Sequence, residues 1–515
     1  MTLSYEFSPV IDGDATTMHV KLTVQGASSD QFVLHMPGQA SKDTVSPWLN
    51  LRSESAETII GARDERGARM VHFSAGKAAV FSYDLQRNWL GPLTTGKQFN
   101  PLIFPTYFEL FGRNALARPQ VKGNETVTAN FDWRALPTAW TLATSFGAGS
   151  DAVSRCQSFT GLRDGMDAAL FAAGDFRLHS FKVGQREVEL AIRGTWSFTD
   201  EEAGNQLRKP IQLARAFWHD ENFPYFLVTL APWDEEDTTE GSGYTNEFWF
   251  FMSPKDVLSR PLWQKDLLHE AFHEWEPRRM GILTESQQAS DWFREGITDY
   301  YADLLAYRGG LLSRAEYAQQ INRGLAAYAN GLKSPYDTGL VLGLWLDSTI
   351  RQRSEGKQSL DDAMFEMVRH QDQGFNEDRV LRTLDGFLSA GDRQALRRGI
   401  EDDAALPWAG AVFATPCLDM VEKRLAVFDL GLNFEKSKAD KVVAGVAVDG
   451  PAHSAGLRDG QKLLSWSVQP QRTDELQTFT VKDADTQGER KLSFYAKKMV
   501  MIPQLSAKPQ NCADR

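Results

Sequence analysis

Two histidines four residues apart, with a glutamate directly after the first, are the clearest chemical feature of the sequence. The segment KDLLHEAFHEWEP contains His269, Glu270 and His273. On an α-helix, residues four apart lie on one face, so both imidazoles can bind a single ion. Glu270 lies about 100° around the helix, where its carboxylate can contact a metal-bound water. The spacing predicts two zinc ligands and a general base; the alternative is a solvated helix that carries two histidines.

A later segment supplies a third ligand. In WFREGITDYYADLL, Glu295 follows His273 by 22 positions. Three protein ligands leave the fourth zinc position for water, as in catalytic zinc sites. Asp299, four residues after Glu295, could accept the second ring N–H of a ligating histidine and fix its tautomer. The two motifs together predict one Zn²⁺ per chain.

Helices are expected to position both motifs. Between residues 254 and 405, apolar residues recur at three- and four-residue spacing, which is typical of helices packed on one face. The clearest segments are PLWQKDLLHEAFHEW, SDWFREGITDYYADLLAYRGG, SRAEYAQQINRGLAAYANG and LVLGLWLDSTIRQRS. The candidate metal ligands therefore lie in a mostly α-helical region.

The rest of the chain favours β-strands. TMHVKLTVQG and AVFSYDL alternate apolar and polar residues, whereas SFKVGQREVELAIRGTWSF, DEEAGNQLRKPIQLARAFWHD and FPYFLVTLAP predict a strand, a helix and a buried strand. After Pro416, the segments LAVFDLGLNFE, VVAGVAVDG and RKLSFYAKKMVMIP again favour strands. We therefore expect a multidomain α+β protein with domains at residues 1–168, 169–420 and 421–515.

Charge and hydropathy exclude some classes of partner. The 515 residues include 56 Lys+Arg and 68 Asp+Glu, a formal net charge of -12, which argues against a generic nucleic-acid or anionic-membrane surface. The sequence contains no run of about 18 apolar residues, which a transmembrane helix would need. The segment MTLSYEFSPVIDGD does not resemble a signal peptide. We expect a cytoplasmic protein, or a periplasmic or secreted one if a leader has been removed.

The three cysteines, Cys156, Cys417 and Cys512, are too few for a disulfide framework and form no CxxC motif. We expect unpaired structural thiols. A Cys417–Cys512 bridge is the alternative if the chain is exported.

The motifs resemble a known family. HEAFHEW followed by WFREGITDYY resembles the gluzincin metallopeptidases, and among them the M61 family of glycyl aminopeptidase-like proteins. LFAAGDFRLHSF resembles the start of the family's catalytic domain, SPYDTGLVLGLWLDSTIR its Y-x-K-G helix, and GVAVDGPAHSAGLRDGQKLLSW its PDZ-like domain. The resemblance covers most of residues 170–470. It implies a thermolysin-like zincin domain followed by a PDZ-like domain, after a β-sandwich-like N-terminal domain.

The resemblance also implies roles for individual residues. It places zinc on the two histidines and Glu295, with Glu270 as the base. Tyr336 corresponds to the tyrosine of the Y-x-K-G motif, which donates its hydroxyl to the oxyanion; a core tyrosine is the alternative. The motif here reads Tyr-Asp-Thr-Gly, so Thr338 replaces the lysine.

A glycine-containing edge strand precedes the active-site helix in the family. In EGSGYTNEFWFFMSP, Gly241, Gly243 and Asn246 fit this strand and are predicted to bind substrate. In the family, a glutamate on this strand holds the free amine of the substrate. No glutamate here clearly takes that position, and Glu240 and Glu247 are the candidates for it. Endopeptidase and exopeptidase action therefore both stay open.

The function predicted from these residues is zinc-dependent peptide hydrolysis by a metal-activated water, of the M61 aminopeptidase type. A peptide-binding scaffold with a vestigial or structural metal site is the alternative. Peptide substrates are the expected partners. DLGLNF resembles the carboxylate-binding loop of PDZ domains, so a peptide C-terminus or a segment of the same chain is a second candidate ligand. The alternative is that this domain is a packing module that binds nothing.

Overall fold

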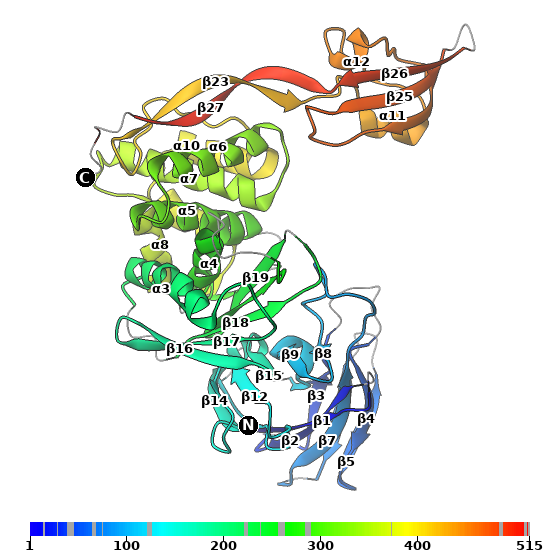
Figure 1. The fold of residues 1–515 in the computed structure, drawn as a ribbon, viewed down its shortest axis with the longest axis vertical. Helices are drawn as coiled ribbons and strands as arrows, with labels where there is room; N and C mark the ends of the chain where they lie inside the picture. Colours follow the sequence, from blue (N-terminus) through cyan, green and yellow to red (C-terminus); the bar gives the residue numbers. More distant parts are fainter. Residues whose placement is uncertain are drawn as a thin grey trace. The chain divides into compact units, whose positions relative to one another are not determined.

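The computed structural model describes the chain except for residues 14–15, 28, 39–45, 64–67, 75, 121–125, 221–224, 237, 256–262, 284–289, 372, 484–487, 509–511 and 513–515. The chain is a multidomain mixed α/β protein (Figure 1) that divides into two compact units, residues 1–278 and 279–515. The domain limits expected at residues 168 and 420 stay predictions.

Three sheets build the first part of unit 1, with strand orders β14-β11-β1-β2-β7-β4, β10-β3-β6-β5 and β13-β12-β15-β9-β8. In β2, the apolar side chains at every second position are fully buried, which confirms the alternation seen in the sequence. The strands are β1 (Thr2–Val10), β2 (Thr17–Gln25), β3 (Gln31–His35), β4 (Trp48–Ser53), β5 (Thr58–Arg63), β6 (Arg69–Phe73), β7 (Ala79–Gln86), β8 (Leu102–Ile103), β9 (Tyr107–Phe111), β10 (Arg118–Pro119), β11 (Thr126–Asp132), β12 (Thr141–Thr144), β13 (Gly147–Gly149), β14 (Cys156–Leu162) and β15 (Leu170–Gly174), with short helices α1 (Gly112–Ala115) and α2 (Arg163–Asp167).

A fourth sheet, which we call the β16–β20 sheet, carries the two long helices of unit 1. Its order is β16-β17-β18-β20-β19, so β19 is an edge strand. The elements are β16 (Arg177–Val183), β17 (Arg186–Ile192), α3 (Asp200–Phe217), β18 (Leu227–Pro232), β19 (Thr239–Tyr244), β20 (Glu247–Met252) and α4 (Trp263–Phe272). Trp249 and Phe251 of β20 belong to a hydrophobic core, whereas Phe250 contacts Trp263 of α4. The predicted strand, helix and buried strand are confirmed.

Helices dominate unit 2 up to residue 402, as the apolar spacing predicts. None of the helices in the described parts of the chain is both long and apolar enough to span a bilayer. The elements are β21 (Ile282–Leu283), the π-helix η2 (Trp292–Ile297), α5 (Thr298–Arg308), α6 (Arg314–Ala329), α7 (Pro335–Arg353), α8 (Leu360–Arg369), β22 (Gly374–Phe375), α9 (Glu377–Asp385) and α10 (Ala390–Asp402).

A two-stranded ribbon follows the helices (Figure 1). β23 (Leu418–Phe428) and β27 (Lys497–Ala507) pair antiparallel over their whole lengths. The ribbon is fixed to α6 by Asn322, whose side-chain amide donates to the carbonyl of Leu505 at 2.8 Å and accepts from its N–H at 2.6 Å. All residues of the small C-terminal sheet lie between the two ribbon strands in sequence.

Cys417 and Cys512 form a disulfide, with their Cα atoms 5.6 Å apart. The expectation of unpaired thiols is therefore wrong for this pair. The reason lies in the ribbon: its register places Leu418 opposite Ala507, so the residues that flank this end are close in space although 95 positions separate them in sequence. Cys156 is a free, exposed thiol.

The small C-terminal sheet has its own apolar core, which includes Leu430, Val443, Leu463 and Phe479. Its elements are α11 (Phe434–Asp440), α12 (Pro451–Ser454), β24 (Lys462–Ser467), β25 (Leu476–Lys482) and β26 (Glu489–Tyr495). The strand expected at VVAGVAVDG is wrong, because this segment forms only an isolated bridge. Its backbone N–H groups bond instead to loop and side-chain oxygens, including those of Ser437 and Asp459.

Candidate metal centre

Helix α4 positions the two histidines. It packs against α3 and against β19 and β20. Phe272, at its end, contacts the rings of Phe217 and Trp218. This packing buries most of the surface of both histidines: His269 is 7% exposed and His273 is 8% exposed. His269 lies in the last turn of α4, and His273 follows directly after its end at Phe272.

The two imidazoles are oriented toward a common point. The Nε2 atoms of His269 and His273 lie 3.1 Å apart. Two nitrogen ligands of a tetrahedral zinc ion lie roughly 3.3 Å apart, given Zn–N bonds of about 2.0–2.1 Å. The Nδ1 atom of His273 lies 3.0 Å from the carbonyl oxygen of Glu276, so a proton on Nδ1 donates to that oxygen and leaves Nε2 free to bind a metal.

The Glu276 carbonyl was not predicted from the sequence. It does for His273 what Asp299 was expected to do for a ligating histidine. Backbone carbonyls have no sequence signal of their own, although a residue three positions after the histidine is within reach of its ring. Asp299 lies in the first turn of α5 and is partly exposed. Its role toward a ligating histidine stays a prediction.

Glu295 completes the candidate ligand set. His269, His273 and Glu295 each offer one ligand atom, and these atoms all lie within 4.8 Å of one another. Glu295 lies in the π-helix η2, a helix type that occurs often at functional sites. Arg294 lies beside it, with its Nη2 atom 3.7 Å from the Glu295 carboxylate. Two neutral imidazoles and a carboxylate are a donor set that zinc accepts, so the residues fit this ion.

Two glycines let η2 and α7 cross closely. A Cβ atom on Gly339 would lie 1.8 Å from the carbonyl oxygen of Trp292 and 2.5 Å from the Cα atom of Gly296. Both neighbours are backbone atoms, so neither can turn aside. The glycine that ends the Tyr-Asp-Thr-Gly motif therefore has a packing role, because it fixes the distance between η2, which carries Glu295, and the first turn of α7.

Gly339→Ala is expected to lower the free energy of unfolding by about 3 kcal/mol, since overpacking of this kind forces the two helices apart. Zinc affinity should fall with it, because η2 carries Glu295. Gly391→Ala in α10 is the matched control: within the described parts of the chain, its Cβ would meet only Ser389 Oγ, at 3.8 Å. Urea unfolding and zinc titration of both variants decide the point, and equal stability of the two would contradict the packing role.

Tyr336 lies at the start of α7 and is 45% exposed, so the alternative of a core tyrosine is wrong. Ser334 caps the helix by accepting the N–H of Asp337 at 3.4 Å. Thr338, which stands in the place of the family's lysine, donates to Asp403 Oδ1 at 2.7 Å. With threonine in place of that lysine, α7 still begins with an ordinary N-cap. The catalytic role of Tyr336 stays a proposal.

The glycines of β19 face α4. A Cβ on Gly241 would lie 2.8 Å from Cγ of Glu270, and one on Gly243 would lie 2.7 Å from the carbonyl oxygen of Glu270 and 3.0 Å from Cβ of His273. The predicted edge strand therefore lies directly against the predicted base and one predicted ligand. Its substrate-binding role is not tested by this placement.

Asn246 makes structural contacts at the turn between β19 and β20. It has a φ of 57°, a conformation that asparagine tolerates better than most residues. Its N–H donates to Glu274 Oε2 at 3.1 Å, and its side-chain amide donates to the carbonyl of Ser145 at 3.4 Å. Arg278 adds a bond to the carbonyl of Gly243. These bonds clamp the turn to the residues around His273.

The two candidate glutamates for a substrate amine lie on the other face of the β16–β20 sheet. Glu240 pairs with Phe251, whereas Gly241 pairs with Phe250, which contacts α4. Burial raises the pKa of the Glu240 carboxyl. Glu247 is 1% exposed and burial raises its pKa well above the ordinary value, against the opposing effect of Arg278. On the face of β19 toward α4, positions 241 and 243 are glycines, so neither of the two glutamates lies on that face.

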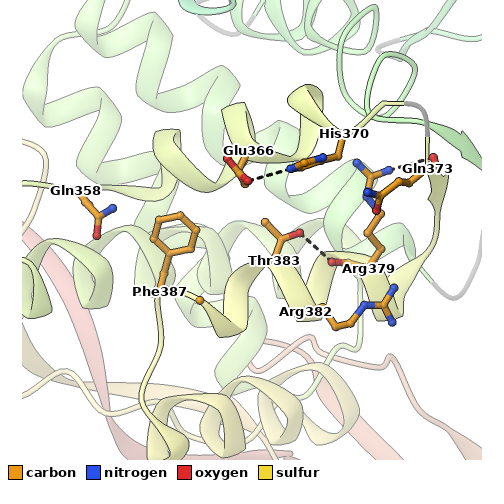
Figure 2. Close-up of a pocket in the computed structure, with 9 residues that line it drawn as sticks. Gln358, Glu366, His370, Gln373, Arg379, Arg382, Thr383 and Phe387 are labelled. Atoms are coloured by element: carbon orange, nitrogen blue, oxygen red, sulfur yellow. Dashed lines mark hydrogen bonds and ion pairs between the residues drawn. The ribbon is translucent and has the colours of Figure 1, made fainter.

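A separate groove of about 520 Å³ lies between α8 and α9 (Figure 2). Its charged groups largely bind one another and the backbone. Glu366 accepts from Arg369 at 2.8 Å and lies 3.1 Å from His370, while Arg379 donates to several carbonyls, including that of Gln373 at 3.2 Å. None of the predicted site residues lines this groove, so it is distinct from the candidate metal centre.

One comparison with known proteins, the family model, covers the same residues. Residues 265–338 match the sequence model of the M61 glycyl aminopeptidase family, while no curated protein sequence matches the chain. An aminopeptidase N family protein from Idiomarina loihiensis has a similar structure, with a TM-score of 0.71, 16% identity and coverage of 98% of each chain. An M1 zinc metallopeptidase from Deinococcus radiodurans gives a TM-score of 0.51 at 15% identity, over 79% of this chain and 94% of that one.

A mutant of an M1 zinc metallopeptidase from Deinococcus radiodurans, bound to a Tyr-Ser-Ala substrate, has a TM-score of 0.50 at 14% identity, over 79% of this chain and 95% of that one. At such identities the structural likenesses concern the fold alone. The family match covers the candidate ligands and the base, and it supports a peptidase. The resemblance to the M61 glycyl aminopeptidases is thus confirmed over residues 265–338, the segment that carries the candidate metal centre.

Proposed function

We propose that the protein is a zinc-dependent peptidase of the M61 aminopeptidase type. His269, His273 and Glu295 would hold one Zn²⁺ per chain, and Glu270 would act as the base. The observation that carries the proposal is the convergence of three ligand atoms within 4.8 Å beside a glutamate that follows the first ligand in sequence. A structural zinc site is normally closed by a fourth protein ligand and has no use for such a base.

The residues around the metal site have distinct tasks in this proposal. When bound, zinc lowers the pKa of a bound water and polarises the scissile carbonyl. Glu270 accepts the proton of that water and later passes it to the leaving amine. Tyr336 donates its hydroxyl to the negative charge that develops on the substrate carbonyl oxygen. The Glu276 carbonyl holds the His273 tautomer that leaves Nε2 free.

The proposal extends to the domains. Residues 169–420 would form a thermolysin-like zincin domain, and residues 421–515 a PDZ-like domain. In the loop that resembles the PDZ carboxylate site, the N–H of Gly431 donates to Asp429 and that of Asn433 donates to the Ala444 carbonyl. Because these two donors are used inside the domain, we limit the proposed partners to peptide substrates of the metal centre.

Digestion of a mixed peptide library, with products identified by mass spectrometry, tests the function. New product ends should appear with the zinc-loaded protein and vanish after chelation. Products one residue shorter at the amino end would establish aminopeptidase action, and internal cuts would establish endopeptidase action. A zinc-loaded protein that cuts nothing would favour the scaffold alternative.

Zinc content gives a separate prediction. The purified protein should hold about one zinc per chain, and His273→Ala should hold almost none, because the remaining two ligands cannot retain the ion. His370→Ala is the matched control, since His370 is an exposed histidine that pairs with Glu366. Elemental analysis of the three proteins is the measurement. Negligible zinc in all three would sink the ligand assignment.

A further inference from the structure

The side chain of Glu270 occupies space next to Gly241. A Cβ atom at position 241 would lie 2.8 Å from Cγ and 3.0 Å from Cδ of Glu270, and 2.9 Å from Cε2 of Phe250. Real Cβ atoms are almost never found at such distances. The Glu270 side chain can therefore lie where it does only because residue 241 has no side chain.

The two glycines of β19 differ in what opposes them. At Gly243 the nearest atom is the backbone carbonyl oxygen of Glu270, at 2.7 Å, so an added methyl group would push helix and strand apart. At Gly241 the opposing groups are side chains. The Phe250 ring is 2% exposed and packs against Trp263, so it is fixed by the core. The Glu270 side chain is only partly buried and is the group that can move.

We propose that Gly241 is a positioning residue for Glu270, in addition to any contact it makes with substrate. The absence of a Cβ at 241 sets the conformation in which the Glu270 carboxylate is held. The inference rests on the proposed function for its catalytic consequence, but the steric relation between the two residues stands without it.

Ser242 provides a control on the same strand. It pairs with Trp249 of β20, whereas Gly241 pairs with Phe250. Paired residues in an antiparallel ladder point to the same face and neighbours along a strand to opposite faces. The Ser242 side chain thus lies on the face away from α4, and a change there alters the same strand without contact to Glu270.

The test compares Gly241→Ala with Ser242→Ala. Gly241→Ala should keep its zinc, lose some thermal stability because the Phe250 ring cannot move away, and lose about 10²-fold in kcat, because a displacement of about 1 Å in a reacting group has that effect. KM should stay unchanged, whereas loss of a substrate-binding contact would raise it. A crystal structure of Gly241→Ala should show the Glu270 carboxylate displaced. Ser242→Ala should match the wild type.

A double-mutant cycle separates positioning from other roles. In a Glu270→Gln background, Gly241→Ala should lower the residual activity by less than about 3-fold, because no base remains to be displaced. A full 10²-fold loss in that background, or unchanged kcat in Gly241→Ala alone, overturns the inference. If the wild-type protein holds zinc but cuts no peptide, the proposed function is wrong. In that case the crystal structure of Gly241→Ala alone tests the steric claim.

Discussion

Glu270→Gln should lower peptide turnover by about 10²–10⁴-fold while the protein keeps its zinc and its fold. The range is that of general acid–base assistance, and the amide cannot accept the proton of the attacking water. Glutamine has nearly the same shape as glutamate, so it fits the space beside Gly241 and leaves the packing of β19 on α4 intact. The side chain is not one of the three candidate ligands, so zinc should remain.

The measurement is single-substrate kinetics on a peptide found in the library digest, together with elemental analysis and thermal unfolding. Glu201→Gln, an exposed glutamate on α3, is the control for the loss of one carboxylate. Turnover close to that of the wild type in Glu270→Gln would show that this carboxylate is not the base. Loss of zinc in the variant would show instead that it helps to hold the ion.

The second large effect concerns Glu109, a carboxyl group in the core of unit 1. Glu109 is 2% exposed, and its Oε1 atom has no hydrogen-bond partner among the residues that the structure describes. Burial raises its pKa to about 8, against a smaller opposing effect of Arg193. The group is therefore neutral at pH 7 in the folded protein, whereas in the unfolded chain it ionises near its ordinary pKa of about 4.3.

The sign of the pH dependence follows from this difference. Between about pH 4.3 and pH 8 the folded state binds a proton at Glu109 that the unfolded state has lost. Stability is fully present below that window and falls as pH rises through it. At about 1.4 kcal/mol for each pKa unit, the loss reaches about 5 kcal/mol above pH 8.

Glu109→Gln should remove this loss, because the amide is neutral at every pH. We expect the variant to gain on the wild type steadily from pH 5 to about pH 8 and to gain little above it, as measured by urea unfolding with tryptophan fluorescence. Glu247 is also buried with a raised pKa, so the variant keeps part of the wild-type slope. Glu187→Gln, on an exposed position of β17, is the control. Parallel pH profiles of Glu109→Gln and wild type would refute the assignment.

Features that depend on local spacing could be predicted from the sequence. The His269–His273 spacing and the helical pattern around Glu295 are local, and the three ligand atoms do come together. The strand, helix and strand that precede α4 were also predictable, because alternation and three- or four-residue spacing each reflect burial of one face. In these segments a single element decides the pattern.

Features that depend on pairing between distant segments could not be predicted. The cysteines meet only because β23 and β27 pair in one register, and no local pattern specifies that register. The close approach of Gly339 to Gly296 and that of Gly241 to Glu270 depend in the same way on how two elements pack. VVAGVAVDG has strand-forming residues, but Gly445 has a φ of 69°, and the segment bonds to loops.

The Cys417–Cys512 bridge joins residues 95 positions apart, and the small C-terminal sheet lies entirely within that span. The disulfide therefore closes a covalent ring around the whole sheet. A protease that cuts the backbone once between residues 418 and 511 opens the ring but releases no fragment, because both new ends stay joined through sulfur. Shedding of this sheet requires two cuts, or one cut and a reductant.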